Sequence, residues 1–170
     1  MNSSGMANYI QNAINEISDP KSALDTFYNA LCEYVENNAE VTYSWVGIQP
    51  GSPPKTDTTT SINAKIKTTG SLSLSNASNP SEANSKFSNA LNTEASKWTI
   101  EFPDDFKLSP CLVIPTINIT PSGANNRNSA WLSVCSQIIS GLKTATPTAT
   151  GSHGSYLAPP GTGATFVSIV

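Results

Sequence analysis

The chain has a single histidine, His153, which by type is the side chain best suited to act as a general base near neutral pH. It lies within a Gly-Ser-His-Gly-Ser run, inside a longer segment of small and polar residues. A catalytic group has to be held within about half an ångström of its productive position, and a Gly/Ser-rich segment does not do this. The sequence therefore favours a solvated histidine over a catalytic one.

Three neighbouring carboxylates are the best candidate for a metal or acid/base site: Glu101, Asp104 and Asp105. Two adjacent aspartates on an extended chain face different ways, and the spacing of an EF-hand calcium loop is absent. We therefore interpret Asp104 and Asp105 as a solvated turn between strands. A small hydrolase built on all three carboxylates is the alternative.

The remaining residue types give no catalytic or metal-binding pattern. The cysteines Cys32, Cys111 and Cys135 lie far apart, and together with His153 they do not match the usual spacing of zinc ligands. The run at 161–163, Gly-Thr-Gly, lacks the Lys and the following helix of a phosphate-binding loop. No nucleophile elbow of the form GxSxG is present. The sequence predicts a non-enzymatic protein without metal or cofactor.

Charge and composition exclude one large class of partner. Charged residues make up only 12% of the chain, the net charge is −3, and Ser, Thr and Asn are abundant. Arg127 is the single arginine, and the lysines are scattered, whereas binding to phosphates needs clustered cations. A hydrated surface of low charge suits a subunit that packs against neighbours, so we expect no nucleic-acid partner.

Apolar spacing predicts several helices and strands. Helical spacing appears over residues 10–17, 20–38, 79–98 and 128–144, and the Asp19-Pro20 and Asn79-Pro80 pairs are typical helix starts. Alternating residues predict strands over 40–48 and over 62–74, the latter as one strand or as two interrupted at Gly70, with a loop at 49–58 between them. Further strands are expected over 99–102 and 111–119, where Pro115 indicates an edge or bulged strand.

This order of elements predicts an α+β fold. We expect a single domain over residues 1–144 with two layers, in which helices pack on one face of a mostly antiparallel sheet with a long hairpin. From residue 145 the composition shifts to Gly, Ser, Thr and Pro, which bury too little to fold alone. Residues 145–170 are therefore expected to form a flexible C-terminal arm.

The large aromatic residues admit two interpretations: Tyr43, Trp45, Trp98 and Trp131. Each lies at a core position of its element's periodicity, so core packing is the favoured interpretation. Tyr43 and Trp45 share one face of the hairpin. A secreted or surface-exposed module that binds a carbohydrate or peptide through this face is therefore the alternative function.

The end of the arm is apolar and rich in β-forming residues, with Phe166, Val167, Ile169 and Val170 as the expected partner-binding side chains. An extended segment of this kind can add to an open sheet edge, where backbone hydrogen bonds supply affinity. The edge can belong to the same chain or to a neighbour, and the sequence leaves both open.

In composition and layout the chain resembles structural subunits of bacteriophage virions or phage-tail-like particles. The resemblance implies a non-enzymatic assembly subunit of a capsid, neck, tail or baseplate, which binds copies of itself or other particle subunits through extended segments. The N-terminus lacks the basic start and apolar stretch of a signal peptide, and no apolar run approaches the roughly 20 residues that cross a membrane. We therefore expect a protein made in the cytoplasm and then incorporated into a particle, with no membrane partner.

Overall fold

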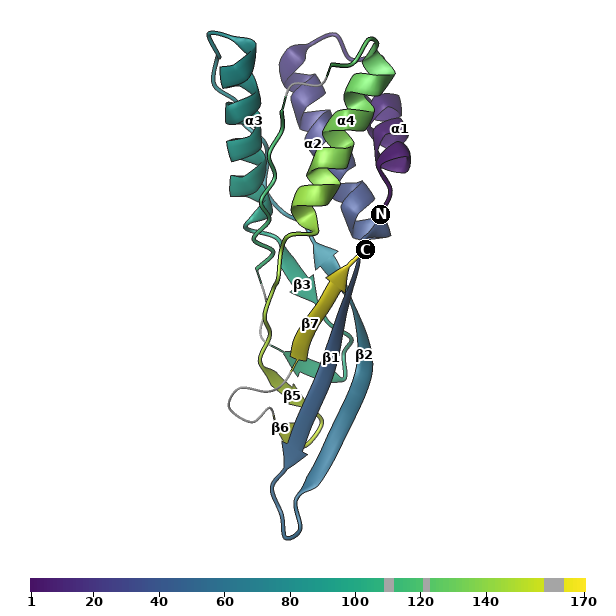
Figure 1. The fold of residues 1–170 in the computed structure, drawn as a ribbon, viewed down its shortest axis with the longest axis vertical. Coiled ribbons are helices and arrows are strands. Elements are labelled where there is room, and N and C mark those ends of the chain that lie inside the picture. The colour runs from purple at the N-terminus through teal and green to yellow at the C-terminus, as the bar shows by residue number, and fades with distance from the viewer. Residues whose placement is uncertain (109–111, 121–122, 158–163) are drawn as a thin grey trace.

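The computed structural model describes residues 1–108, 112–120, 123–157 and 164–170. Figure 1 shows an elongated molecule in which helices gather at one end and a curled antiparallel sheet forms the other. The two termini lie close together where the helices meet the sheet. The predicted α+β class, the antiparallel sheet and the long hairpin are confirmed.

The helices are α1 (Ser3–Ile14), α2 (Pro20–Asn38), α3 (Pro80–Ala95) and α4 (Arg127–Leu142). Each helix is capped in the same way at its N-terminus. The side chain of an Asn or Asp just before the helix accepts a hydrogen bond from the amide three residues later. The caps are Asn2, Asp19, Asn79 and Asn126. The predicted starts at Asp19 and Asn79 are confirmed, while α1 and α4 begin earlier than the periodicity indicated.

The strands are β1 (Glu40–Gln49), β2 (Lys55–Lys67), β3 (Thr99–Glu101), β4 (Phe106–Leu108), β5 (Gly151–His153), β6 (Tyr156–Leu157) and β7 (Ala164–Ile169). They pair in the order β3-β2-β1-β6-β5-β4, and β7 pairs with β1 as well. β1 and β2 form the predicted hairpin, whose tip at 50–54 is exposed and lies beyond every other element in Figure 1.

The second strand of the hairpin differs from the prediction at both ends. It begins at Lys55, inside the expected loop, and it stops at Lys67 without continuing toward Leu74. Past Lys67 the backbone turns away from the sheet: Gly70 has a φ of 104°, and the Thr68 amide donates to the Glu36 carboxylate at 2.7 Å. The Glu36 carboxylate of α2 thus satisfies a backbone amide that would otherwise need a neighbouring strand.

The strand predicted over 111–119 is not formed: within residues 112–120 only Leu112 makes an isolated bridge. Leu112 bridges Thr99 of β3, and from there the chain runs between α3 and α4 (Figure 1). Its side chains alternate between buried and exposed, with Val113, Ile117 and Ile119 buried. The expected position Cys111 lies outside the described residues.

The backbone of this extended segment is hydrogen-bonded by helix side chains in place of a neighbouring strand. Asn92 of α3 accepts from the Ile117 amide and donates to the Ile117 carbonyl, both at 2.7 Å. Ser88 Oγ accepts from the Ile119 amide at 2.8 Å, and Gln137 of α4 accepts from the Thr120 amide at 2.7 Å. Polar residues that sequence periodicity assigns to helix surfaces therefore complete the fold.

The C-terminal region differs from the expected flexible arm. β5 pairs with β4 and β6, and β7 pairs with β1 from Val41↔Ile169 to Trp45↔Ala164. Ahead of these strands Ala145, Pro147 and Ala149 are buried, and the Tyr43 hydroxyl donates to the Pro147 carbonyl at 3.1 Å. Small side chains let this backbone lie close to the sheet. Residues whose types are typical of a linker are therefore part of the core here. Residues 158–163 of the arm lie outside the described residues.

Candidate functional site

His153 is the centre of a polar cluster on the inner face of the curled sheet. Its Nδ1 lies 2.7 Å from Asp57 Oδ2, and its Nε2 lies 3.4 Å from Asp105 Oδ2. The same Asp57 oxygen accepts a hydrogen bond from Trp45 Nε1 at 3.0 Å. The imidazole also stacks on Phe106, with ring centroids 4.2 Å apart. The cluster joins β2 to β5 and to the turn before β4.

This arrangement corrects the expectation of a solvated histidine, because only 27% of the His153 side chain is exposed. It also differs from a catalytic triad. Both ring nitrogens face carboxylates, and in the described part of the chain no Ser, Thr or Cys side chain bonds to the ring. A base–nucleophile pair would need one ring nitrogen directed at a hydroxyl or thiol. The ring instead links β5 to β2 through its bond to Asp57, and we call this pair of residues the His153 clamp.

Sequence reasoning missed this clamp for two reasons. The proline- and glycine-rich pattern predicts a loop over 49–58, whereas Asp57 lies in β2. Its partner His153 is separated from it by 96 residues, so no local pattern links them. Alternation continued from the buried Ile62 would have placed Asp57 on the solvent face, and the register shift between Tyr43 and Trp45 is what brings Asp57 to the same face as Trp45.

The three acidic candidates do not form one site. Asp104 and Asp105 are exposed in a turn closed by a hydrogen bond from the Phe106 amide to the Pro103 carbonyl at 2.9 Å, as the sequence predicted. Glu101 lies in β3, paired in register with Lys65 of β2. Across the residues that the structure describes, no group of three His, Cys, Asp or Glu side chains has a geometry that could hold a metal ion.

The two described cysteines, Cys32 and Cys135, are free thiols. Burial raises the pKa of Cys32, and it raises the pKa of Cys135 to about 12. A thiol becomes a nucleophile or a metal ligand only as its thiolate. Both side chains therefore act as small apolar residues, as their positions in helical stripes predicted.

The aromatic residues follow the core interpretation. Tyr43 and Trp45 are 0% exposed and Trp98 is 1% exposed. The hairpin face that carried the alternative of a carbohydrate- or peptide-binding module is thus covered by the protein itself. Trp131 is half-buried, stacked on Phe27 of α2 with ring centroids 5.7 Å apart.

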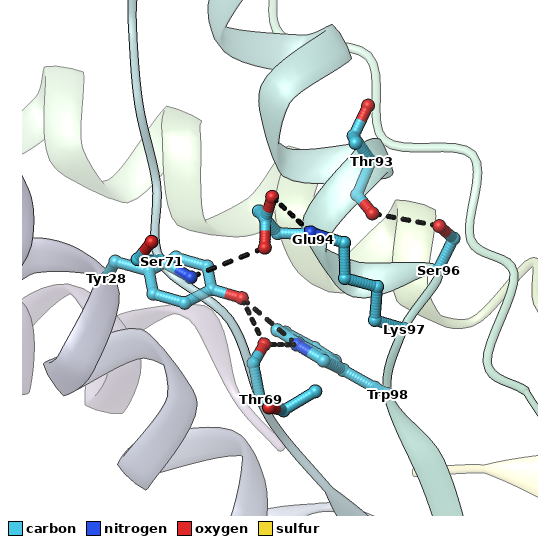
Figure 2. Close-up of polar contacts among 8 residues, drawn as sticks. All are labelled: Tyr28, Thr69, Ser71, Thr93, Glu94, Ser96, Lys97 and Trp98. Atoms are coloured by element: carbon cyan, nitrogen blue, oxygen red, sulfur yellow. Dashed lines mark hydrogen bonds and ion pairs between the residues drawn. The ribbon is translucent and has the colours of Figure 1, made fainter.

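A second polar cluster connects the helices to the sheet (Figure 2). Trp98 Nε1 donates to the Tyr28 hydroxyl and to the Thr69 carbonyl, each at 3.2 Å, and the Tyr28 hydroxyl donates to the same carbonyl at 2.9 Å. Burial raises the pKa of Tyr28, which keeps this phenol a donor. Glu94 accepts from the Ser71 amide and from Lys97. Each polar group faces another part of the chain, so the cluster positions α2 and α3.

One open, apolar cavity lies at the helical end of the molecule. We call it the helix-end groove, with a volume of about 420 Å³, and its lining residues are Ile14, Pro20, Ala23, Leu24, Phe27, Phe87, Ala130, Trp131 and Val134. They come from the end of α1, the first half of α2, the middle of α3 and the first half of α4. The groove has three aromatic rings and no charged lining residue.

The predicted partner-binding residues differ in their exposure, because β7 is part of the sheet. Phe166 packs edge-on against Tyr43 and Ile169 is buried opposite Val41, so these two stabilise the chain's own fold. Val167 and Val170 are exposed. The sequence allowed this segment to pair with its own chain or with a neighbour, and in the structure β7 pairs with β1 of its own chain.

The described chain contains no helix of sufficient length and apolarity to span a bilayer. Comparisons with protein families, with curated proteins and with solved structures gave no match.

Replacing His153 with alanine is expected to destabilise the protein by about 1–3 kcal/mol, because it removes the ring contacts with Phe106 and Trp45 and one partly buried hydrogen bond. Asp105→Asn is the matched control, with an expected effect below about 0.5 kcal/mol, since 63% of the Asp105 side chain is exposed. Urea unfolding measures both. Equal effects of the two changes would contradict the clamp.

Proposed function

We propose that this protein is a non-enzymatic structural subunit of a larger particle of the phage or phage-tail-like kind, in which it binds neighbouring subunits. The observation that carries the proposal is the β1–β2 hairpin, which extends to the far end of an elongated molecule (Figure 1). A catalytic or ligand-binding domain has no evident need for such an extension. A subunit that must reach its neighbours does.

The outer edge of β2 supports this function. β3 pairs with β2 only from Lys65 to Lys67, so within the described chain residues 55–64 have no strand on that side. An open edge of this length offers a row of backbone donors and acceptors to another chain. Exposed threonines on this edge, Thr56 and Thr58, favour extended structure.

The outer face near the hairpin tip is apolar. Val46 and Ile48 of β1 are exposed, and Leu157, which pairs with Ile48, is exposed beside them. Adjacent exposed apolar residues on a surface of low charge are typical of sites where proteins associate. The sheet thus has an open edge and an apolar outer face at the same end.

Assembly of the purified protein tests the proposal directly. We expect the mass from light scattering to rise above that of one chain with increasing concentration, and ordered rings, tubes or filaments in negative-stain images. The double variant Val46→Thr/Ile48→Thr should weaken this assembly while its melting temperature stays close to wild type, because both side chains are exposed. A chain that remains monomeric at millimolar concentration would contradict the proposal.

A further inference from the structure

We propose that the helix-end groove binds the proline-rich hairpin tip of a second copy of this chain, so that subunits join head to tail. The inference rests on the proposed assembly function and names the contact by which assembly proceeds. Both halves of the contact are present in every copy, at opposite ends of the molecule (Figure 1).

The groove has the chemistry that proline segments bind. Phe27 contacts Phe87 and Trp131, with ring centroids 5.5 and 5.7 Å apart, so three aromatic rings lie together along its wall. Proline rings pack on aromatic side chains that line grooves, and a turn whose backbone is already closed loses little entropy when it docks. Leu24 and Val134 complete an apolar lining that water solvates poorly.

The tip has the matching chemistry. Residues 50–54 read Pro-Gly-Ser-Pro-Pro, and all of them are exposed. A turn between two strands needs no such density of proline, and exposed proline rings leave apolar surface in water. The tip is also short, since the residue pair Gln49↔Lys55 ends the β1–β2 ladder directly beneath it.

A second copy is the occupant that the geometry requires. The residues that line the groove belong to the four helices, and Figure 1 shows the helices at the opposite end of the molecule from the β1–β2 tip, so one chain cannot bring its own tip to its own groove. A contact between two different surfaces is heterologous, and it repeats into a ring or an open filament. This is the type of contact that particle subunits use.

Charge gives the contact an orientation. The cation nearest the tip is Lys55, which is exposed. On the rim of the groove, the connection between α1 and α2 carries Glu16 and Asp19 beside a single cation, Lys21, whereas α4 begins with Arg127. Lys55 should therefore lie toward the α1–α2 connection of the next subunit and away from α4.

The test uses one variant of each half. Pro50→Ser/Pro53→Ser/Pro54→Ser removes the tip chemistry, and Ala23→Gln/Ala130→Gln fills the groove without removing core atoms. We expect each variant alone to associate at least tenfold more weakly than wild type in sedimentation equilibrium. Mixed together, they should form a one-to-one dimer with wild-type affinity that grows no further, because one intact tip and one intact groove remain.

Two further variants keep the test decisive if the filled groove disturbs folding. Glu16→Lys is exposed and should weaken association several-fold, and Lys55→Glu in the same chain should restore it. Ala83→Gln, exposed on α3 outside the groove, is the control and should change nothing.

The outcomes separate this inference from the proposed function. If wild type assembles and the tip variant assembles equally well, the groove contact is wrong and the assembly function stands. If the mixed variants continue to grow beyond a dimer, the contact is likewise wrong. If wild type is monomeric at every concentration, the proposed function itself fails.

Discussion

Replacing Trp45 with alanine is expected to destabilise the protein by roughly 3–5 kcal/mol, as truncation of a fully buried aromatic residue does. Its ring is 0% exposed, packs edge-on against Phe106 with centroids 5.9 Å apart, and covers the backbone at Gly47, where an added Cβ would lie 2.7 Å from the indole. The substitution also removes the Trp45 hydrogen bond to Asp57 and so loosens the His153 clamp.

Chemical unfolding followed by circular dichroism measures the loss. Trp45→Phe is the control: it keeps an aromatic ring in the core and loses only volume and the Nε1 donor, so we expect a loss of about 1–2 kcal/mol. Equal losses in the two variants would show that the hydrogen bond to Asp57 dominates, and a loss below about 1 kcal/mol for alanine would contradict the assigned core.

Replacing Asn92 with alanine is expected to cost roughly 2–5 kcal/mol, because it leaves both backbone groups of Ile117 without their partner. The segment they belong to cannot find another strand, since it lies between α3 and α4. Gly141 shows how closely it is held there: a Cβ at this position would lie 2.6 Å from the Ile117 Cα atom. We expect the extended segment to detach before the sheet unfolds.

Amide hydrogen exchange at Ile117 and Ile119 measures this local loss, and denaturant unfolding measures the global one. Asn92→Asp should have an intermediate effect, because a carboxylate accepts from the Ile117 amide and cannot donate to its carbonyl. Thr93→Ala, whose side chain is exposed on the same helix, is the control with an expected effect below about 0.5 kcal/mol. A neutral Asn92→Ala would contradict the role given to this side chain.

Local patterns in the sequence determined the elements whose causes are local. The Asp19-Pro20 and Asn79-Pro80 starts are confirmed because a cap and its amide lie three residues apart. The long hairpin was predicted because alternation marks a half-buried strand, and the same alternation placed Tyr43 and Trp45 in the core. The α+β class follows from the order of these elements.

Only the tertiary structure decided where polar and small residues belong. Composition predicted a solvated His153 and a flexible arm, yet the fold buries much of the imidazole against Asp57 and pairs β7 with β1. The segment at 112–120 looked like a strand, and its hydrogen-bond partners are side chains of α3 and α4. The physical reason is the same in each case. Hydrogen bonds and close packing between residues far apart in the chain depend on the position of both partners, whereas caps and alternation are complete within a few residues.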